Sequence, residues 1–100
     1  MATIEMQQAL MKVKTALRLT EYAFDDELLD LMHAAVADLG IAGVNGDKAI
    51  IQDPLVRQAV ITYCRANFGQ PDEYDRLKKS YDEQKAQLSM SDGYTDWGVI

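Results

Sequence analysis

The sequence has few of the residues from which catalytic and metal sites are usually built. It contains one cysteine and one histidine in 100 residues. A single cysteine cannot form an internal disulfide, which is typical of a protein that folds in a reducing compartment. A metal site needs several converging ligands, and no spacing of His, Cys and Asp supplies them. We therefore interpret His33 as a partly exposed structural residue and Cys64 as a buried, inert thiol.

An excess of basic residues and a long apolar run are also missing. The net charge is −6, which disfavours tight binding to duplex DNA because such binding neutralises phosphates with Lys and Arg. No apolar run approaches the roughly 20 residues that span a bilayer, and residues 1–8 lack the features of a signal peptide. No phosphate-binding glycine motif follows the glycines of residues 40–46. The sequence thus predicts no catalytic, cofactor-binding or metal-binding residues, and no membrane partner.

Apolar residues recur at helical spacing along most of the chain, which predicts an all-α fold. The expected helices cover about 4–18, 25–39, 53–68 and 71–89, with the first short or frayed. Three long helices would then form a small bundle, followed by an irregular tail. The length fits one domain over residues 1–100, with residues 90–100 as a docking tail. The 48% hydrophobic and 26% charged fractions are ordinary for a globular protein.

Residues that favour helix ends mark two of these segments. Asp53 is expected to cap the third helix, with Pro54 at its first position and Gly69 in the left-handed conformation at its end. This helix, apolar over much of its surface, is predicted to form the middle of the core. Asp25 is expected to cap the second helix and Gly40 to end it.

The second helix carries two further expectations. Ile41 is predicted to fold back on Val36, because a hydrophobic contact often accompanies a glycine helix end. Asp25, Asp26 and Glu27 resemble half of a divalent-ion site. The same acids are favoured at a helix N-terminus and no calcium-loop pattern surrounds them, so we interpret them as helix-start residues.

Two segments without helical periodicity leave alternatives open. In residues 41–52, Asn45 and Gly46 fit a tight turn, so this stretch forms either a small hairpin or, the interpretation we favour, an interhelical loop. The tail carries four apolar side chains, at Tyr94, Trp97, Val99 and Ile100. It either folds back onto its own core or docks into another subunit. We favour docking.

Five blocks of sequence occur in a fixed order: V-K-T-A-L-R-L-T, A-F-D-D-E-L-L-D-L, A-D-L-G-I-A-G-V, D-P-L-V-R-Q-A-V-I-T-Y-C-R-A-N-F-G and Y-D-R-L-K-K-S-Y-D-E-Q-K-A-Q-L. Together they resemble the small head–tail connector family of tailed bacteriophages and prophages, whose members are also labelled DNA-packaging proteins. The resemblance runs from about Lys12 to Trp97, and residues 1–11 and 45–51 fit it least well.

The resemblance implies a structural virion protein, assembled in the bacterial host cytoplasm and located at the head–tail interface. It implies a closed, twelve-fold ring of identical subunits that binds below the portal protein and continues the DNA channel. The ring would present the surface on which a stopper or tail-completion protein assembles. DNA would pass without sequence-specific binding. Tyr63, Arg65 and Asn67 are then expected where the core of the third helix meets an interface.

A second hypothesis is a small helical prophage regulatory protein that binds DNA or another protein. The connections that follow the first and second expected helices are longer than a helix-turn-helix turn, and no helix concentrates base-reading residues. An enzyme subunit is a third hypothesis, for which the chain offers only His33 and Cys64.

Overall fold

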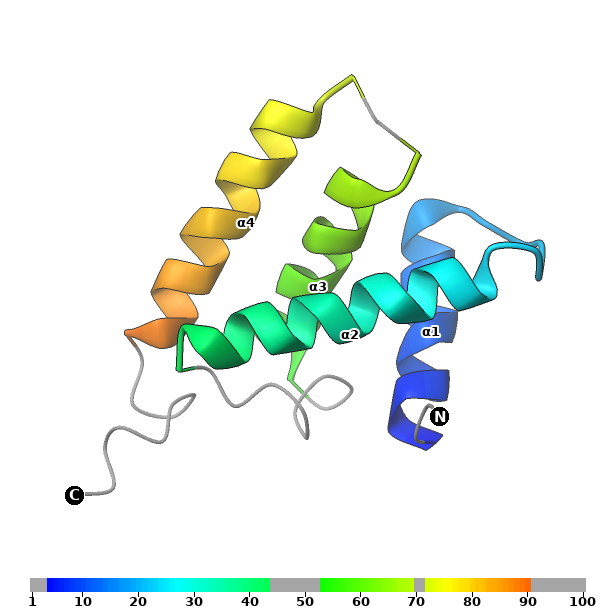
Figure 1. Ribbon diagram of the computed structural model, residues 1–100, viewed down its shortest axis with the longest axis horizontal. Coiled ribbons are helices and arrows are strands. Elements are labelled where there is room, and N and C mark those ends of the chain that lie inside the picture. The colour runs from blue at the N-terminus through cyan, green and yellow to red at the C-terminus, as the bar shows by residue number, and fades with distance from the viewer. Residues whose placement is uncertain (1–3, 44–52, 70–71, 91–100) are drawn as a thin grey trace.

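The computed structural model describes residues 4–43, 53–69 and 72–90. These residues form four helices and no strand: α1 (Ile4–Leu17), α2 (Asp25–Ile41), α3 (Pro54–Asn67) and α4 (Tyr74–Ser89), shown in Figure 1. The predicted all-α class is confirmed. All four predicted helices are present, but the predicted bundle of three long helices with a short first one was wrong, because α1 has 14 residues, as many as α3.

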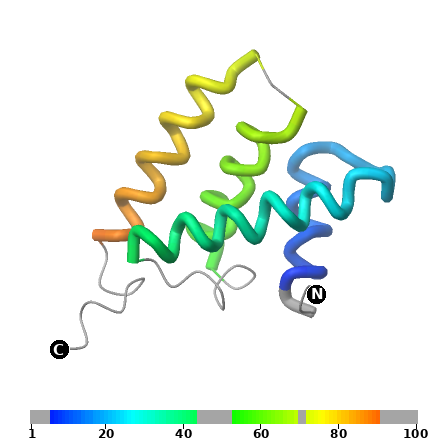
Figure 2. The backbone as a smooth tube through the Cα atoms, viewed as in Figure 1, coloured from blue at the N-terminus to red at the C-terminus, as the bar shows by residue number. Residues whose placement is uncertain are grey.

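Helix α3 lies at the centre of the molecule and packs against each of the other helices. Figure 2 shows α4 running alongside α3, while α2 crosses in front of α3 and α1. The body is flat, measuring 45 × 31 × 18 Å. One hydrophobic cluster joins all four helices. Its largest fully buried side chains are Leu28, Met32, Leu39, Val13, Val56, Val60 and Cys64.

Both ends of α3 have clear local causes. Asp53 occupies the N-cap position, where its Oδ1 accepts hydrogen bonds from the N–H of Leu55 at 2.9 Å and of Val56 at 3.4 Å. Pro54 is the first helical residue, where its missing N–H leaves no bond unmade. Beyond the helix, Gly69 has φ 74°, a conformation that glycine adopts readily. The residues at both ends therefore define where α3 begins and ends.

The start of α2 differs from the prediction. Phe24, not Asp25, occupies the N-cap position, and no side chain makes a capping hydrogen bond there. The Asp25 carboxylate lies instead 2.7 Å from Lys14 Nζ, a cation that is only 7% exposed. A buried charge is costly unless it is paired, whereas a helix cap contributes about 1 kcal/mol. Pairing with Lys14 therefore takes precedence over capping.

The end of α2 also differs, because the helix continues through Gly40 as far as Ile41. The left-handed residue is Gly43, with φ 91°, and its N–H donates to the Gly40 carbonyl at 3.0 Å. The Ile41 side chain is 87% exposed and does not fold back on Val36. Glycine is tolerated inside a helix at a cost of about 1 kcal/mol, so a second glycine three residues later can end it.

Other predicted features lie partly outside the described residues. Helix α4 begins at Tyr74, with Glu73 at the N-cap, and not at 71; Pro71 itself is not described. The hairpin or loop around Asn45–Gly46 and the tail residues Tyr94, Trp97, Val99 and Ile100 are outside these ranges as well. The alternatives for the loop and the tail therefore stay predictions.

Candidate interaction surfaces

A polar link fastens the C-terminal part of α2 to α4. The Tyr81 hydroxyl donates to Asp38 Oδ2 at 2.6 Å, and Lys85 Nζ donates to the same oxygen at 3.0 Å. Tyr81 and Lys85 are four residues apart on α4 and so lie on one face of that helix. We call these three residues the α2–α4 brace. It fixes the position of α4 relative to α2.

The protonation states of Asp38 and Tyr81 in the brace do not change near neutral pH. Burial alone would raise the pKa of Asp38, but the hydrogen bonds from Tyr81 and Lys85 and the charge of Lys85 outweigh it and lower that pKa. Burial and the bond to Asp38 raise the pKa of Tyr81 above its usual range. The carboxylate therefore stays ionised and the phenol stays protonated. Such a pair stabilises structure and does not exchange protons at neutral pH.

A recess of about 250 Å³ lies beside the brace, lined by Asp38, Tyr63, Ala66, Asn67, Tyr74, Lys78, Tyr81, Asp82 and Lys85. The rings of Tyr63 and Tyr81 meet edge to face, with centroids 5.2 Å apart. The Asn67 amide donates to the Tyr63 carbonyl at 2.9 Å. Tyr63 and Asn67 thus stand at the edge of the core, on a surface that a neighbouring protein can reach.

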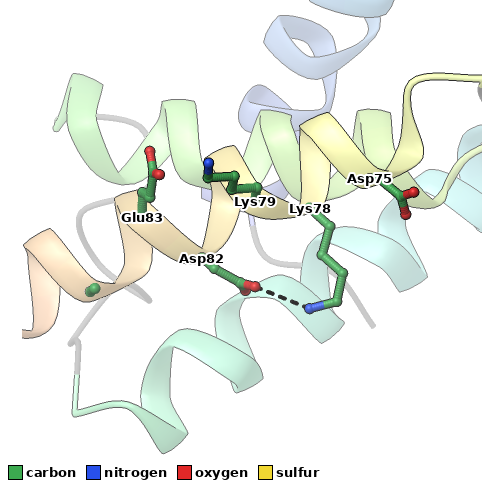
Figure 3. Close-up of a pocket in the computed structure, with 6 residues that line it drawn as sticks. Asp75, Lys78, Lys79, Asp82 and Glu83 are labelled. Atoms are coloured by element: carbon green, nitrogen blue, oxygen red, sulfur yellow. Dashed lines mark hydrogen bonds and ion pairs between the residues drawn. The ribbon is translucent and has the colours of Figure 1, made fainter.

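The outer face of α4 carries charges of both signs. Figure 3 shows Asp75, Lys78, Lys79, Asp82 and Glu83 on this helix. These residues line a shallow recess of about 390 Å³. Lys78 Nζ lies 3.1 Å from Asp82 Oδ2, and this hydrogen bond raises the pKa of the lysine. An exposed pair of this kind adds little stability. The face is suited to solvent or to a polar interface.

On another side of α3 lies a groove between α1 and α3, of about 420 Å³. We call it the α1–α3 groove; its lining residues are Met11, Lys12, Thr15, Ala16, Arg57, Gln58 and Ile61. Met11 is 66% exposed, which is unusual for a large apolar side chain, and Ile61 is 5% exposed. The groove therefore combines an apolar floor with two cationic side chains, Lys12 and Arg57.

Three arginines from different helices or their ends line a further hollow of about 460 Å³: Arg18, Arg65 and Arg76. Arg65 donates to the Ala16 carbonyl at 3.1 Å, and Arg76 pairs with Glu73 at 2.6 Å. Arg18 has φ 60°, an uncommon value for a residue other than glycine. Arg65, expected at the border of core and interface, thus joins the ends of α3 and α1.

The two residues with reactive side chains lie apart from these surfaces. His33 is exposed on α2, and Cys64 is fully buried in α3, where burial raises the pKa of its thiol to about 12. Within the described ranges, no group of three or more His, Cys, Asp or Glu side chains could hold a metal ion. None of the four helices has the length and apolar character needed to cross a membrane.

Sequence reasoning did not identify the α2–α4 brace or the Lys14–Asp25 pair. The sequence contains only a weak indication of each pair, a charged residue next to a buried apolar one. Lys14 stands next to Val13 in the apolar stripe of α1, and Asp38 precedes the buried Leu39, so each charge lies at the edge of a buried face. Which opposite charge each would meet depends on how the helices cross.

A family model described as "Phage connector protein" matches residues 9–95 of the chain. The chain belongs to this phage head–tail connector family. The resemblance seen in the sequence is thereby confirmed. A connector of this family is a structural component of the virion and associates with other head or tail proteins. Comparisons with curated proteins and with solved structures gave no significant match.

Proposed function

We propose that this connector forms a closed ring of twelve copies below the portal protein, at the head–tail interface of the virion. The ring continues the DNA channel and presents the surface on which a stopper or tail-completion protein assembles. Each chain forms a single domain over residues 1–100 and is assembled into particles in the host cytoplasm. The observation that carries the proposal is the family match over residues 9–95.

The shape and surfaces of the chain support a ring. A ring is built from one head-to-tail interface that closes on itself, so each subunit needs two different contact surfaces. The chain offers the mixed-charge outer face of α4 and, on another side of α3, the α1–α3 groove with its exposed Met11. The α2–α4 brace holds α4 in a fixed place, so that the two surfaces keep one relative position.

The charge of the chain supports a channel through which DNA slides. With a net charge of −6, a ring of these subunits repels the phosphate backbone overall, which prevents DNA from adhering. We accordingly propose an acidic lumen. A ring whose channel wall is lined by lysines and arginines contradicts this part of the proposal.

A prophage regulatory protein is the alternative, and the connection between α1 and α2 argues against it. That connection covers residues 18–24, which is longer than the three or four residues of a helix-turn-helix turn. Salt-dependent binding to duplex DNA distinguishes a regulator from a connector.

Deletion of residues 90–100 tests the proposed role in particle assembly. The core cluster uses residues 6–88, so the truncated chain should keep its helical circular dichroism. Particles assembled with the truncated chain should have filled heads that fail to join tails. Normal tail attachment with the truncated chain would contradict the proposed role of the tail.

A further inference from the structure

The α1–α3 groove has the size and composition to receive a short peptide segment. Its floor includes Met11, which is 66% exposed, and its rim carries Lys12 and Arg57. Leu55, 52% exposed, lies three residues before Gln58 and so on the same side of α3, which extends the apolar surface. A partner that fits must bring apolar side chains and negative charge together.

The tail of the chain has this composition. Residues 91–100 read S-D-G-Y-T-D-W-G-V-I, with no basic residue. Two aspartates, Asp92 and Asp96, alternate with aromatic residues at Tyr94 and Trp97. The aromatic residues suit an apolar floor that presents a methionine, because sulfur makes favourable contacts with aromatic rings. The aspartates suit a cationic rim.

We propose that the tail of one copy, residues 91–100, lies in the α1–α3 groove of the next copy around the ring. This inference rests on the proposed function and adds to it the surface and the segment that join neighbours. A tail inserted in one direction into the next copy is a head-to-tail contact, the type that closes into a ring. Each copy then gives one tail and receives one.

The positions of the two partners favour a neighbouring copy over the same chain. In Figure 1 the end of α4, from which the tail continues, lies at one end of the molecule, and α1 lies toward the other. The longest dimension of the body is 45 Å, whereas ten residues span at most about 35 Å when fully extended. A tail that ran back along its own body would use part of this reach before it arrived at the groove beside α1.

Cross-linking with engineered cysteines tests this contact in the full-length protein. Gln58→Cys places a thiol in the groove, and Val99→Cys places one in the tail. Cys64 does not interfere, because it is fully buried and its thiol pKa is raised to about 12. The double variant is oxidised alone and with portal protein, and denaturing electrophoresis without reductant shows which chains are joined.

We expect a ladder of covalently joined copies from the double variant. The matched control combines Val99→Cys with His33→Cys, which is exposed on α2 and lies apart from both proposed contact surfaces, and it should give no ladder. A disulfide within one chain shows that the tail folds onto its own groove and overturns the inference. Rings that form with the portal but without a ladder overturn the inference and leave the proposed function standing. Failure to form a ring at all contradicts the proposed function itself.

A charge exchange tests the chemistry of the contact. Lys12→Glu, introduced into the cross-linking variant, should slow formation of the ladder because it places a negative charge beside the acidic tail. Adding Asp92→Lys and Asp96→Lys to the Lys12→Glu chain should restore the rate at which the ladder forms. An unchanged rate in Lys12→Glu contradicts the charge pairing. If the groove instead binds DNA, the cross-linking variant without Lys12→Glu will give no ladder, and Lys12→Glu will reduce the retention of duplex DNA. That result overturns the inference.

Discussion

Tyr81 donates a 2.6 Å hydrogen bond to Asp38, a residue 43 positions earlier in the chain. The bond joins α4 to the last turns of α2, whereas hydrophobic packing joins both helices to α3. Lys85 donates to the same carboxylate oxygen at 3.0 Å and compensates for its partial burial. These polar atoms join α4 directly to α2, in addition to the packing of both helices on α3.

Tyr81→Phe should lower the free energy of unfolding by about 1–2 kcal/mol, because it removes a hydrogen bond to a charged acceptor. Urea denaturation followed by circular dichroism measures the change. Tyr74→Phe is the matched control, since Tyr74 lines the same recess and its hydroxyl makes no hydrogen bond with the described residues. Equal stability of Tyr81→Phe and the unchanged protein would show that the brace contributes nothing.

The contribution of Asp38 should depend on pH in the acidic range. The pKa of Asp38 is lower in the folded chain than its ordinary value of 3.8, so folding favours the carboxylate. The stability it provides is present above the ordinary value and is lost as the pH falls through the lowered one. The difference in unfolding free energy between the unchanged protein and Asp38→Asn should therefore shrink below about pH 4. A difference that grows on acidification contradicts this assignment.

Gly40→Ala should stabilise the connector by about 0.5–1 kcal/mol, because glycine inside a helix loses more conformational freedom than alanine. Gly40 lies within α2, and a Cβ added there meets no atom within 4 Å. Gly43→Ala is the paired variant, and it should destabilise because Gly43 has φ 91°. Thermal unfolding of both variants gives the comparison. Destabilisation by Gly40→Ala would instead indicate that α2 ends at Gly40.

Arg18→Gly should raise the stability of the chain by roughly 0.5–1 kcal/mol. Arg18 ends α1 in a Schellman arrangement: its N–H donates to the Thr15 carbonyl at 3.1 Å, and the N–H of Leu19 donates to Lys14 at 2.9 Å. The position favours glycine, and a side chain there costs about 1–2 kcal/mol. Arg18→Ala removes the same charge but keeps the strain, so it should give no gain. A gain in both variants would assign the effect to charge.

The sequence predicted the features of the fold that depend on neighbours along the chain. Helical spacing of apolar residues indicated all four helices, and the Asp-Pro pair marked the start of α3, because these signals act within one or two turns. Two predictions for α2, its N-cap and its last residue, were wrong for different reasons. The helix begins at Asp25 as predicted, but Asp25 pairs with Lys14, eleven residues earlier and in another helix, and does not cap. The end is set by competition between two glycines, which spacing alone does not decide.

The candidate surfaces were less accessible to sequence reasoning. The α2–α4 brace and the α1–α3 groove exist only where helices distant in sequence meet, and their positions follow from the crossing of α2, α3 and α4. The resemblance to the connector family led us to expect Tyr63, Arg65 and Asn67 where the core of α3 meets an interface. The contacts that these residues make depend on how α3 packs against α1 and α4.

The mass of the protein alone and with portal protein, measured by size-exclusion chromatography with light scattering, tests the central claim most directly. One chain has a mass of 11.2 kDa. We predict that addition of portal protein produces a single complex that contains a closed ring, twelve copies of the chain on one portal assembly. A chain that remains at 11.2 kDa beside an unaltered portal, at concentrations well above those of assembly, would contradict the claim that this connector forms a ring below the portal.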